Sequence, residues 1–316
     1  MKALIYRKFG DPDVLEWVEG WPKPVVSPGK VLIRSIAGGV NPKDVLLRKG
    51  KFSCTLAREP LPRVSGADVA GEIVEVGKGV AGFKVGDIVF GMTNKFSGGV
   101  HSEWATLGAN EIACVPSNIS AVEASSIPLA AQTALQALRD YCGVKAGQRV
   151  LINGASGGVG HFAVQIAKAL GAEVHAVCGS GHLDFVTSLG ADVVHDYTVE
   201  PAPTINSAFH SVFDVFGRYS MGDFAKQLGV AGIFVSTVPK PVTMFGELLA
   251  LTAFNKRSRL VLVGSNTADL TQISEWVETR QLSPHVEKVY PAASAHEAHC
   301  HIEGKHTTGK VVIGFQ

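Results

Sequence analysis

Short apolar runs separated by glycine and proline make up most of the first 120 residues. Four of these runs predict strands, at residues 31–36, 72–76, 87–90 and 112–115. Dense turn signals lie between them, for example Ser27-Pro28-Gly29. Short strands at this regular spacing favour a barrel or a sandwich over a layered α/β sheet.

The pattern changes near residue 120. Ser120 and Glu123 form a capping-box pair that opens a helix, and Pro128 is expected to break or kink that helix. From residue 149 onward, strands and helices alternate. The predicted strands are 149–153, 173–178, 193–195, 212–216, 232–238 and 259–264, and the predicted helices are 160–170, 183–189 and 224–228. The strands are nearly continuous apolar runs, which is typical of parallel strands buried on both faces.

These patterns predict two domains. Residues 121–266 form a doubly wound α/β domain, and residues 1–120 form a β-rich domain. The tail, 267–316, contains a helical part and a final strand at 310–315 that returns to complete the first domain. A chain of 316 residues has the usual length for two domains.

Composition excludes several classes of protein. Hydrophobic residues are 46% and charged residues 18%, which argues against a disordered chain. Lys and Arg number 29 against 28 Asp and Glu, so there is no basic excess for nucleic acid or an anionic membrane. The five cysteines are too scattered for a disulfide framework or a zinc knuckle. With no signal-peptide core and no apolar stretch of about 18 residues, we expect a cytoplasmic protein that does not cross a membrane.

A glycine-rich turn joins the predicted strand 149–153 to the predicted helix 160–170. The turn reads Asn153-Gly-Ala-Ser-Gly-Gly-Val-Gly160. In a dinucleotide site the first glycine makes the tight turn, the second lets the backbone approach the diphosphate, and the third lets the helix pack against the strand. The helix N-terminus then offers N–H groups to the phosphates. The residues assigned to the cofactor here are Gly154, Ser156, Gly157, Gly158, Val159 and Gly160.

Two other interpretations of this turn remain open. The segment also fits G-x-S-x-G, the nucleophile elbow of α/β-hydrolases, with Ser156 as nucleophile and Asp214 and His285 as partners. The third glycine and the β-rich domain ahead of the turn favour the dinucleotide interpretation over the hydrolase. The turn can also be a merely tight connection with no ligand.

The end of the second α/β strand bears on the choice of cofactor. An NAD site usually carries Asp or Glu there to bind the ribose 2′-hydroxyl, but this strand ends at Cys178 and no carboxylate follows before Asp184. Without that carboxylate, a 2′-phosphate is not repelled. Ser180, His182 and Tyr197 are candidate donors to the phosphate, so NADPH is favoured.

The chain resembles the medium-chain dehydrogenase/reductase superfamily, in its zinc-independent quinone oxidoreductase (zeta-crystallin-like) branch. The resemblance rests on motifs spread along nearly the whole chain. They are Met1-Lys-Ala-Leu4, Gly39-Val-Asn-Pro-Lys-Asp44, Gly66-Ala-Asp-Val-Ala-Gly-Glu-Ile-Val74, Phe83-Lys-Val-Gly-Asp-Ile-Val89, the turn at 153–160, Val263-Gly-Ser-Asn266 and Gly304-Lys-His-Thr-Thr-Gly-Lys310.

The resemblance implies a GroES-like β-barrel catalytic domain, a Rossmann domain with a doubly wound parallel sheet, and a homodimer. It adds cofactor contacts at Asn41, Thr133, Phe216, Val263, Ser265 and Lys310. Relatives with catalytic zinc carry Cys and His-Glu where this chain has Val40-Asn41 and Ala67-Asp68. The His- and Cys-rich tail segment (His296, His299, Cys300, His301, His306) is interpreted as a set of polar residues on the surface, so we expect no metal.

Chemistry without a metal favours a conjugated substrate. Hydride can add to a carbon of a quinone or an enone while the charge spreads onto oxygen. Asn41 is the candidate donor to that oxygen, because its amide does not titrate, although a turn role before Pro42 stays open. Phe52, Met92 and Phe96 are candidates for an apolar pocket. The alternatives are an enoyl-thioester reductase and a non-catalytic NADPH-binding protein.

Overall fold

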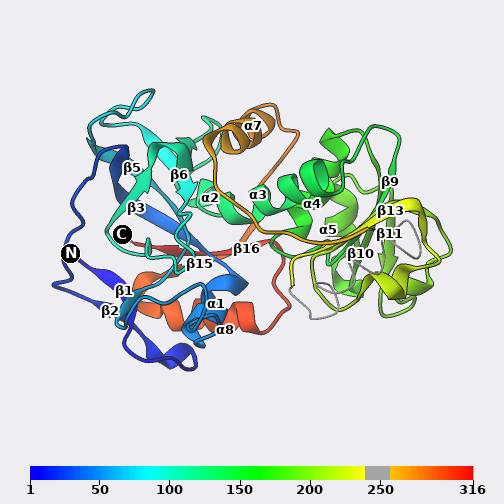
Figure 1. The fold of residues 1–316 in the computed structure, drawn as a ribbon, viewed down its shortest axis with the longest axis horizontal. Coiled ribbons are helices and arrows are strands. Elements are labelled where there is room, and N and C mark those ends of the chain that lie inside the picture. Colours follow the sequence, from blue (N-terminus) through cyan, green and yellow to red (C-terminus); the bar gives the residue numbers. More distant parts are fainter. Residues whose placement is uncertain (239–256, 316) are drawn as a thin grey trace. The chain divides into compact units, whose positions relative to one another are not determined.

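The computed structural model describes residues 1–238 and 257–315, which fall into two compact units. Unit 1 comprises Met1–Gln132 and Gly264–Gln316, and unit 2 comprises Thr133–Val263. The sequence patterns placed the divisions after residues 120 and 266, whereas the units divide after 132 and 263. The first division lies later because the helix α2 (Ala121–Ala124) packs on strands of unit 1. Both ends of the chain belong to unit 1 (Figure 1).

Unit 1 is built from two largely antiparallel sheets. Its strands are β1 (Ala3–Tyr6), β2 (Leu15–Val18), β3 (Lys30–Val40), β4 (Arg63–Val64), β5 (Asp68–Val76), β6 (Ile88–Met92), β7 (Trp104–Gly108), β8 (Ile112–Cys114), β15 (Val286–Pro291) and β16 (Lys310–Gly314). The small sheet has the order β2-β1-β4, and the large one the order β15-β16-β3-β5-β6-β8, with β7 also paired to β3. The four strands predicted between residues 31 and 115 are confirmed.

The helices of unit 1 include α1 (Pro42–Arg48), α7 (Thr267–Glu278) and α8 (Ala295–Glu303). The predicted return of the final strand is confirmed, because β16 pairs antiparallel with β3, Val311 lying opposite Val40. In Figure 1 the red strand β16 accordingly lies beside the blue strand β3. This pairing brings a residue near the C-terminus, Lys310, next to the start of α1.

In the described part of unit 2, six parallel strands form one sheet. They are β9 (Arg149–Asn153), β10 (Glu173–Cys178), β11 (Val193–Asp196), β12 (Phe209–Asp214), β13 (Leu228–Ser236) and β14 (Arg257–Leu260). The strand order is β11-β10-β9-β12-β13-β14. In chain order this is 3-2-1-4-5-6, the order of a Rossmann sheet, so the predicted doubly wound α/β fold is confirmed. Buried apolar residues such as Leu151, Val212 and Phe234 form the core against the sheet.

The helices of unit 2 include α3 (Pro128–Gln136), which begins in unit 1, then α4 (Gly160–Ala169) and α5 (Leu183–Ser188). The capping box at Ser120 and the interruption of the helix at Pro128 are confirmed. After α3 the chain makes the π-helical turn η3 (Ala137–Tyr141).

One predicted element of unit 2, a helix, is wrong. The strands expected at 212–216, 232–238 and 259–264 are present with other bounds, Phe209–Asp214, Leu228–Ser236 and Arg257–Leu260. The strand expected at 212–216 ends at Asp214, because the carboxylate of Asp214 accepts the backbone N–H groups of Gly217 and Tyr219 and turns the chain. The helix expected at 224–228 is a short 3₁₀ turn, Met221–Phe224, opened by Ser220 and Asp223. Leu228 already belongs to strand β13, where it lies opposite Phe209.

Candidate functional site

The glycine turn of unit 2 permits a very close approach of helix α4 to the end of β9. Gly154 has φ +89°, a backbone conformation that residues with a side chain rarely adopt. A Cβ on Gly160 would lie 2.0 Å from the carbonyl oxygen of Gly154 and 2.8 Å from the Cα of Ala155. Both obstacles are backbone atoms, so only glycine fits at residue 160. The spacing found in the sequence therefore has a steric cause at its first and third positions.

The N-terminus of α4 has no side-chain cap, and in its first turn the His161 N–H donates to Gly157 O at 3.0 Å. Val159 occupies the N-cap position. The turn itself is fixed from the other side, because the N–H groups of Gly154 and Ala155 both donate to Val177 O of β10, at 3.1 and 3.0 Å. A helix N-terminus with a fixed glycine turn suits the diphosphate of a dinucleotide, so these residues fit that group.

The position of the turn in the sheet agrees with this assignment. β9 pairs with β10 on one side and with β12 on the other, so the strand order reverses at β9. In open parallel sheets, ligands bind outside the carboxyl ends of the strands at such a switch point. The turn at 153–160 and the loop after Asp214 both follow carboxyl ends of adjacent strands there.

Asp214 fixes the loop beside the glycine turn. Its buried carboxylate accepts hydrogen bonds from Asn153 Nδ2 at 2.8 Å, Gly217 N at 3.0 Å and Tyr219 N at 2.9 Å. Phe216, in the loop that these bonds fold, is 52% exposed. Because Asp214 is committed to these donors, it is a poor acid partner for a Ser156 triad, and the Rossmann strand order also argues against the hydrolase.

The ends of β10 and β11 carry the residues assigned to the adenosine ribose. Cys178 is buried, and burial raises the pKa of its thiol to about 11, which leaves it as a neutral packing residue. The Tyr197 ring, 47% exposed, faces Gly179, whose added Cβ would lie 3.2 Å from the phenol oxygen. The Ser180 hydroxyl lies 2.9 Å from Thr198 Oγ1. His182 lies in a short 3₁₀ turn just before α5.

A carboxylate that the sequence pattern did not predict lies at this edge. Asp196 ends β11 and lies opposite Cys178 in the parallel register. Its Oδ1 accepts Thr198 N and Thr198 Oγ1, at 2.8 and 2.7 Å. Hydrogen bonds from Ser180 first, and then from Thr198, lower the pKa of Asp196, so the group is charged. Asp196 is on the third strand of the sheet and not on the second. Its position beside Cys178 is therefore found from the strand register, and not from its distance along the chain from the glycine turn.

A second polar cluster lies in unit 1 around Asn41. Lys310 Nζ donates to Asn41 Oδ1 at 2.5 Å and to Val40 O at 3.0 Å, and Asn41 Nδ2 donates to Asp68 Oδ2 at 2.9 Å. Asp68 Oδ1 accepts the backbone N–H of Leu129 at 2.9 Å. Asn41, Asp68 and Lys310 are each at most 2% exposed. We call these three residues, with Asp44, the buried polar cluster.

The buried polar cluster engages the amide of Asn41. The carboxamide oxygen accepts from Lys310, and the NH₂ group donates to Asp68 and, at 3.4 Å, to Gly39 O. The backbone N–H of Asn41 donates to Asp44 Oδ2, which opens helix α1. This geometry does not favour the expected role of Asn41 as a donor to substrate oxygen. It favours a residue that fixes the loop.

Burial perturbs every ionisable group in this cluster. It raises the pKa of Asp44 to about 7, with a further contribution from the charge on Asp68. It raises the pKa of Asp68 to about 6 against the lowering effects of Lys310 and Asn41. Burial also lowers the pKa of Lys310, which the two carboxylates partly oppose. A concentration of shifted groups of this kind is characteristic of functional sites.

The remaining predicted contacts are divided between the two units. Thr133, buried in α3, and Val263 belong to unit 2. Ser265 belongs to unit 1, where its N–H donates to Asn94 Oδ1 at 2.7 Å and its Oγ to Glu111 O at 3.2 Å. Ser265 is 5% exposed, and these bonds tie the start of the tail to the loop after β6 and to the 3₁₀ turn before β8.

The His-rich tail segment forms helix α8 and the residues after it. The interpretation as polar residues on the surface is wrong for His299, which is fully buried and whose pKa burial lowers to about 3. It lies on the inner face of α8 with Ala295 and Ala298. His301 lies 3.1 Å from the Tyr290 hydroxyl. Within residues 1–238 and 257–315, no group of three or more His, Cys, Asp or Glu side chains is arranged to hold a metal ion.

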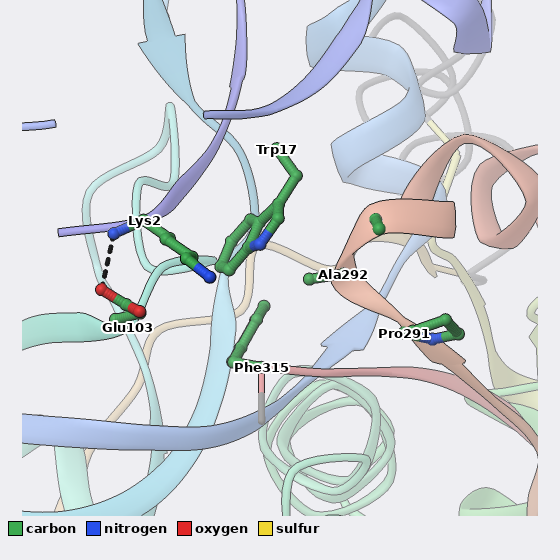
Figure 2. A pocket seen from close by; sticks show the side chains of 7 residues that line it. Lys2, Trp17, Glu103, Pro291, Ala292 and Phe315 are labelled. Carbon is green, nitrogen blue, oxygen red and sulfur yellow. Dashed lines mark hydrogen bonds between the residues drawn. The ribbon is translucent and has the colours of Figure 1, made fainter. Parts of the chain in front are cut away.

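A pocket of about 380 Å³ lies elsewhere in unit 1 (Figure 2). The Trp17 and Phe315 rings stack beside it at 5.8 Å, and Lys2 N donates to Glu103 Oε2 at 2.6 Å. None of the candidate site residues lines this pocket. We therefore do not include it in the site. In the part of the chain that is described, no helix combines the length and the apolar character needed to span a membrane.

Comparison with known proteins gives matches along the whole chain. A model of the alcohol dehydrogenase GroES-like domain matches residues 27–122, and one of the zinc-binding dehydrogenase domain matches residues 189–313. The chain is 33% identical to the chloroplastic quinone-oxidoreductase homolog of Spinacia oleracea, over 99% of this chain and 98% of that protein. It is 32% identical to the chloroplastic NADPH-dependent alkenal/one oxidoreductase of Arabidopsis thaliana, over 99% and 79%.

Among solved structures, the quinone oxidoreductase from Coxiella burnetii superposes with a TM-score of 0.90 at 30% identity, over 100% of this chain and 99% of that one. The GroES-like match covers strands β3 to β8 of unit 1. Together with the strand order of unit 2, these matches confirm the predicted fold class.

Proposed function

We propose that this chain is a zinc-independent, NADPH-dependent reductase of quinones and α,β-unsaturated carbonyls. The chain belongs to the medium-chain dehydrogenase/reductase superfamily and is a homologue of its quinone oxidoreductases. Its relatives are named for quinone and alkenal/one reduction, so the chain is an oxidoreductase that uses a nicotinamide cofactor. The finer statement, NADPH and a conjugated substrate without zinc, is the proposal.

The observation that carries the proposal is the glycine turn at the switch point of the unit 2 sheet. Gly160 lies so close to Gly154 that no side chain fits, and the N-terminus of α4 has no side-chain cap. Gly154, Gly157 and Gly158 would hold the diphosphate, with the N–H groups of α4 donating to it. When bound, the cofactor supplies a hydride.

The preference for NADPH rests on the edge formed by β10 and β11. Tyr197 and His182 offer donors to a 2′-phosphate, and Ser180 adds one where its hydroxyl turns away from Thr198 and Asp196. The second strand ends at Cys178 without a carboxylate. Asp196 opposes this preference, because a charged carboxylate bonded to Thr198 repels a phosphate. Because the donors favour NADPH and the charge of Asp196 disfavours it, the ratio of the affinities for NADPH and NADH should be measured.

The donors in unit 1 suit chemistry without a metal. The carboxylate of Asp68 accepts hydrogen bonds from Asn41 and from the Leu129 N–H, and the positive charge of Lys310 lies near it. Protein groups therefore satisfy this carboxylate. A polarised conjugated system needs no Lewis acid to accept a hydride at carbon, provided that its oxygen is hydrogen-bonded. What unit 1 supplies is a rigid loop at 39–44, fixed by the buried polar cluster.

Steady-state oxidation of NADPH with a panel of 1,2- and 1,4-quinones and small enones tests this function. We expect turnover of at least one quinone, and tighter fluorescence-detected binding of NADPH than of NADH. Bound cofactor without turnover across the panel contradicts the proposed substrate class. Activity that a chelator such as EDTA abolishes, and added zinc restores, contradicts zinc independence.

We also infer a cytoplasmic homodimer. The dimer is an inference from the family resemblance, and the compartment an inference from the sequence. The plant relatives named above are chloroplastic. Light scattering coupled to size exclusion tests the dimer, and fractionation of the source cells tests the compartment.

A further inference from the structure

Lys43 is a half-buried cation at the beginning of α1. Its Nζ lies 4.7 Å from the centroid of the Phe96 ring. The Phe96 ring in turn meets the Phe52 ring edge-on, with centroids 5.4 Å apart and an interplanar angle of 81°. Phe52 and Phe96 are both half-buried, so neither ring is packed fully into the core. We call Lys43, Phe52 and Phe96 the aromatic–lysine patch.

The ammonium group of Lys43 has no carboxylate within ion-pair distance among the described residues. Lys49, at the other end of the same helix, does pair with Glu303. The acidic groups that act on Lys43 are Asp44 and Asp68, which are buried and bonded to Asn41 instead. Burial lowers the pKa of Lys43, and these two carboxylates only partly compensate for it.

The position of Lys43 is costly for folding. It is in the first turn of α1, where the helix dipole favours an acidic residue over a cation. Half-burial of an ammonium without an anionic partner adds a desolvation cost. Cation–π contact with Phe96 offsets this only in part, because such a contact contributes about 0.5–2 kcal/mol. A ligand oxygen is the partner that this geometry lacks.

We propose that Lys43 binds the carbonyl oxygen of the substrate, while the substrate ring or conjugated chain lies against Phe52 and Phe96. This proposal rests on the proposed function and assigns the oxygen-binding role to Lys43 in place of Asn41. Asn41 has its amide engaged by Lys310 and Asp68, whereas Lys43 Nζ has no hydrogen-bond partner among the described residues. Met92, the third apolar candidate, is 2% exposed and belongs to the core.

The step balances in electrons and protons. The hydride, with its two electrons, forms a C–H bond at the substrate, and the displaced π-electron pair moves to the substrate oxygen. Lys43 first donates a hydrogen bond to that oxygen and then transfers one proton, which forms the O–H bond of an enol. With a quinone, this enol then loses a proton from the ring carbon that took the hydride, and the second carbonyl oxygen gains a proton from water, which gives the hydroquinone. Lys43 is left as a neutral amine, and a proton from water restores the ammonium group.

The test compares Lys43→Met and Lys43→Arg with a matched control, Lys23→Met. Lys23 also lies over an aromatic ring, 3.7 Å from the centroid of Trp104, but is exposed and outside the buried polar cluster. The quinone is duroquinone, whose ring positions are all methylated, because the exposed thiols of Cys54, Cys114 and Cys300 would add to an unsubstituted quinone. The enone is 2-cyclohexen-1-one.

We expect Lys43→Met to lower kcat by about 100-fold, the usual effect of removing one donor to a developing oxyanion. The Kd for NADPH and the melting temperature should stay within twofold and a few degrees of wild type. The loss should be larger for the enone, whose enolate is more basic, and Lys43→Arg should recover part of the activity. A purely structural role would not make the loss depend on the basicity of the product oxygen.

The proposal is overturned if Lys43→Met turns over duroquinone within threefold of wild type, or if Lys23→Met loses as much activity. It is also overturned if the loss is the same for quinone and enone. If wild type binds NADPH but reduces neither compound, nor the wider panel, the proposed function fails together with the role of Lys43. An active wild type with an unaffected Lys43→Met variant refutes only the inference about Lys43.

Discussion

Replacing Gly160 by alanine should damage unit 2 in a way that replacing Gly157 does not. The added Cβ at residue 160 would be 2.0 Å from Gly154 O, whereas an ordinary contact begins near 3.4 Å. The helix or the turn must therefore move by more than 1 Å, and the atoms in the way are backbone. Overpacking of this kind costs about 1–3 kcal/mol, and the higher helix propensity of alanine offsets at most about 1 kcal/mol.

Gly157 is the matched comparison in the same turn. A Cβ there would lie 3.6 Å from Gly154 O, an ordinary contact, so Gly157→Ala should change the free energy of unfolding by less than about 0.5 kcal/mol. Its methyl group would instead occupy the space through which the backbone approaches the diphosphate. We expect about a tenfold weaker Kd for NADPH, which corresponds to about 1.4 kcal/mol.

The assay must report on each unit separately. All four tryptophans, at 17, 21, 104 and 276, lie in unit 1. Tryptophan fluorescence therefore follows unit 1, and far-ultraviolet circular dichroism follows both units. Gly160→Ala should move the dichroism transition to lower temperature by about 4 °C per kcal/mol, ahead of the fluorescence transition. Gly222→Ala, where a Cβ has 3.7 Å of clearance, controls for glycine replacement in general.

Two results would refute this reasoning. The first is a Gly160→Ala variant with wild-type unfolding and wild-type NADPH affinity, since the backbone clash would then be absent in solution. The second is a Gly157→Ala variant that loses as much stability as Gly160→Ala, because the second glycine would then be structural and not a cofactor contact.

Three further outcomes follow from the charges. Burial raises the pKa of Asp44 to about 7, so the folded chain keeps a proton that the unfolded chain releases near pH 4, and this contribution to the free energy of unfolding is full below pH 4 and lost as pH rises to about 7. Urea unfolding of Asp44→Asn across that range should show a smaller decline than wild type, and the remainder comes from Asp68, whose pKa is raised to about 6. Glu303→Gln leaves the buried guanidinium of Arg48 with one partner fewer and should lower the urea-unfolding free energy by about 1–3 kcal/mol, less than for a fully buried pair because Glu303 is partly exposed. Asp196→Asn keeps an acceptor for Thr198 but removes the negative charge, so fluorescence titration should show a several-fold shift in affinity toward NADPH over NADH.

The sequence predicted the fold of unit 2 well because its signals are local. The apolar runs at 149–153 and 173–178 are the strands β9 and β10 without a change of bounds. The capping box at Ser120 and the glycine turn depend on residues within eight positions of each other. The errors lie where a distant group decides the local structure. Strand β12 stops at Asp214 because that carboxylate binds Asn153 on another strand as well as the turn that follows.

The candidate site was only partly predictable, for the same reason. Asp196 faces Cys178 through the register of two parallel strands, and the spacing along the chain contains no sign of that pairing. Lys310 reaches Asn41 only because β16 pairs with β3. Whether the amide of Asn41 is free or engaged depends on its contacts with Lys310 and Asp68. Sequence identified Asn41 as a special residue, but its role as an anchor required the partners that the fold brings to it.

The buried polar cluster also constrains the function by its cost. Lys310, Asp44 and Asp68 are each at most 2% exposed, and apolar replacement of buried ionic groups is often neutral or stabilising. Packing alone would therefore have no use for them. Together they fix the amide of Asn41 and the first turn of α1, and Lys43 follows two residues later on that turn. The cost of burying three ionisable groups is explained if the loop that carries Lys43 has to be held in place when a substrate oxygen binds, because a mobile lysine would stabilise the charge on that oxygen less.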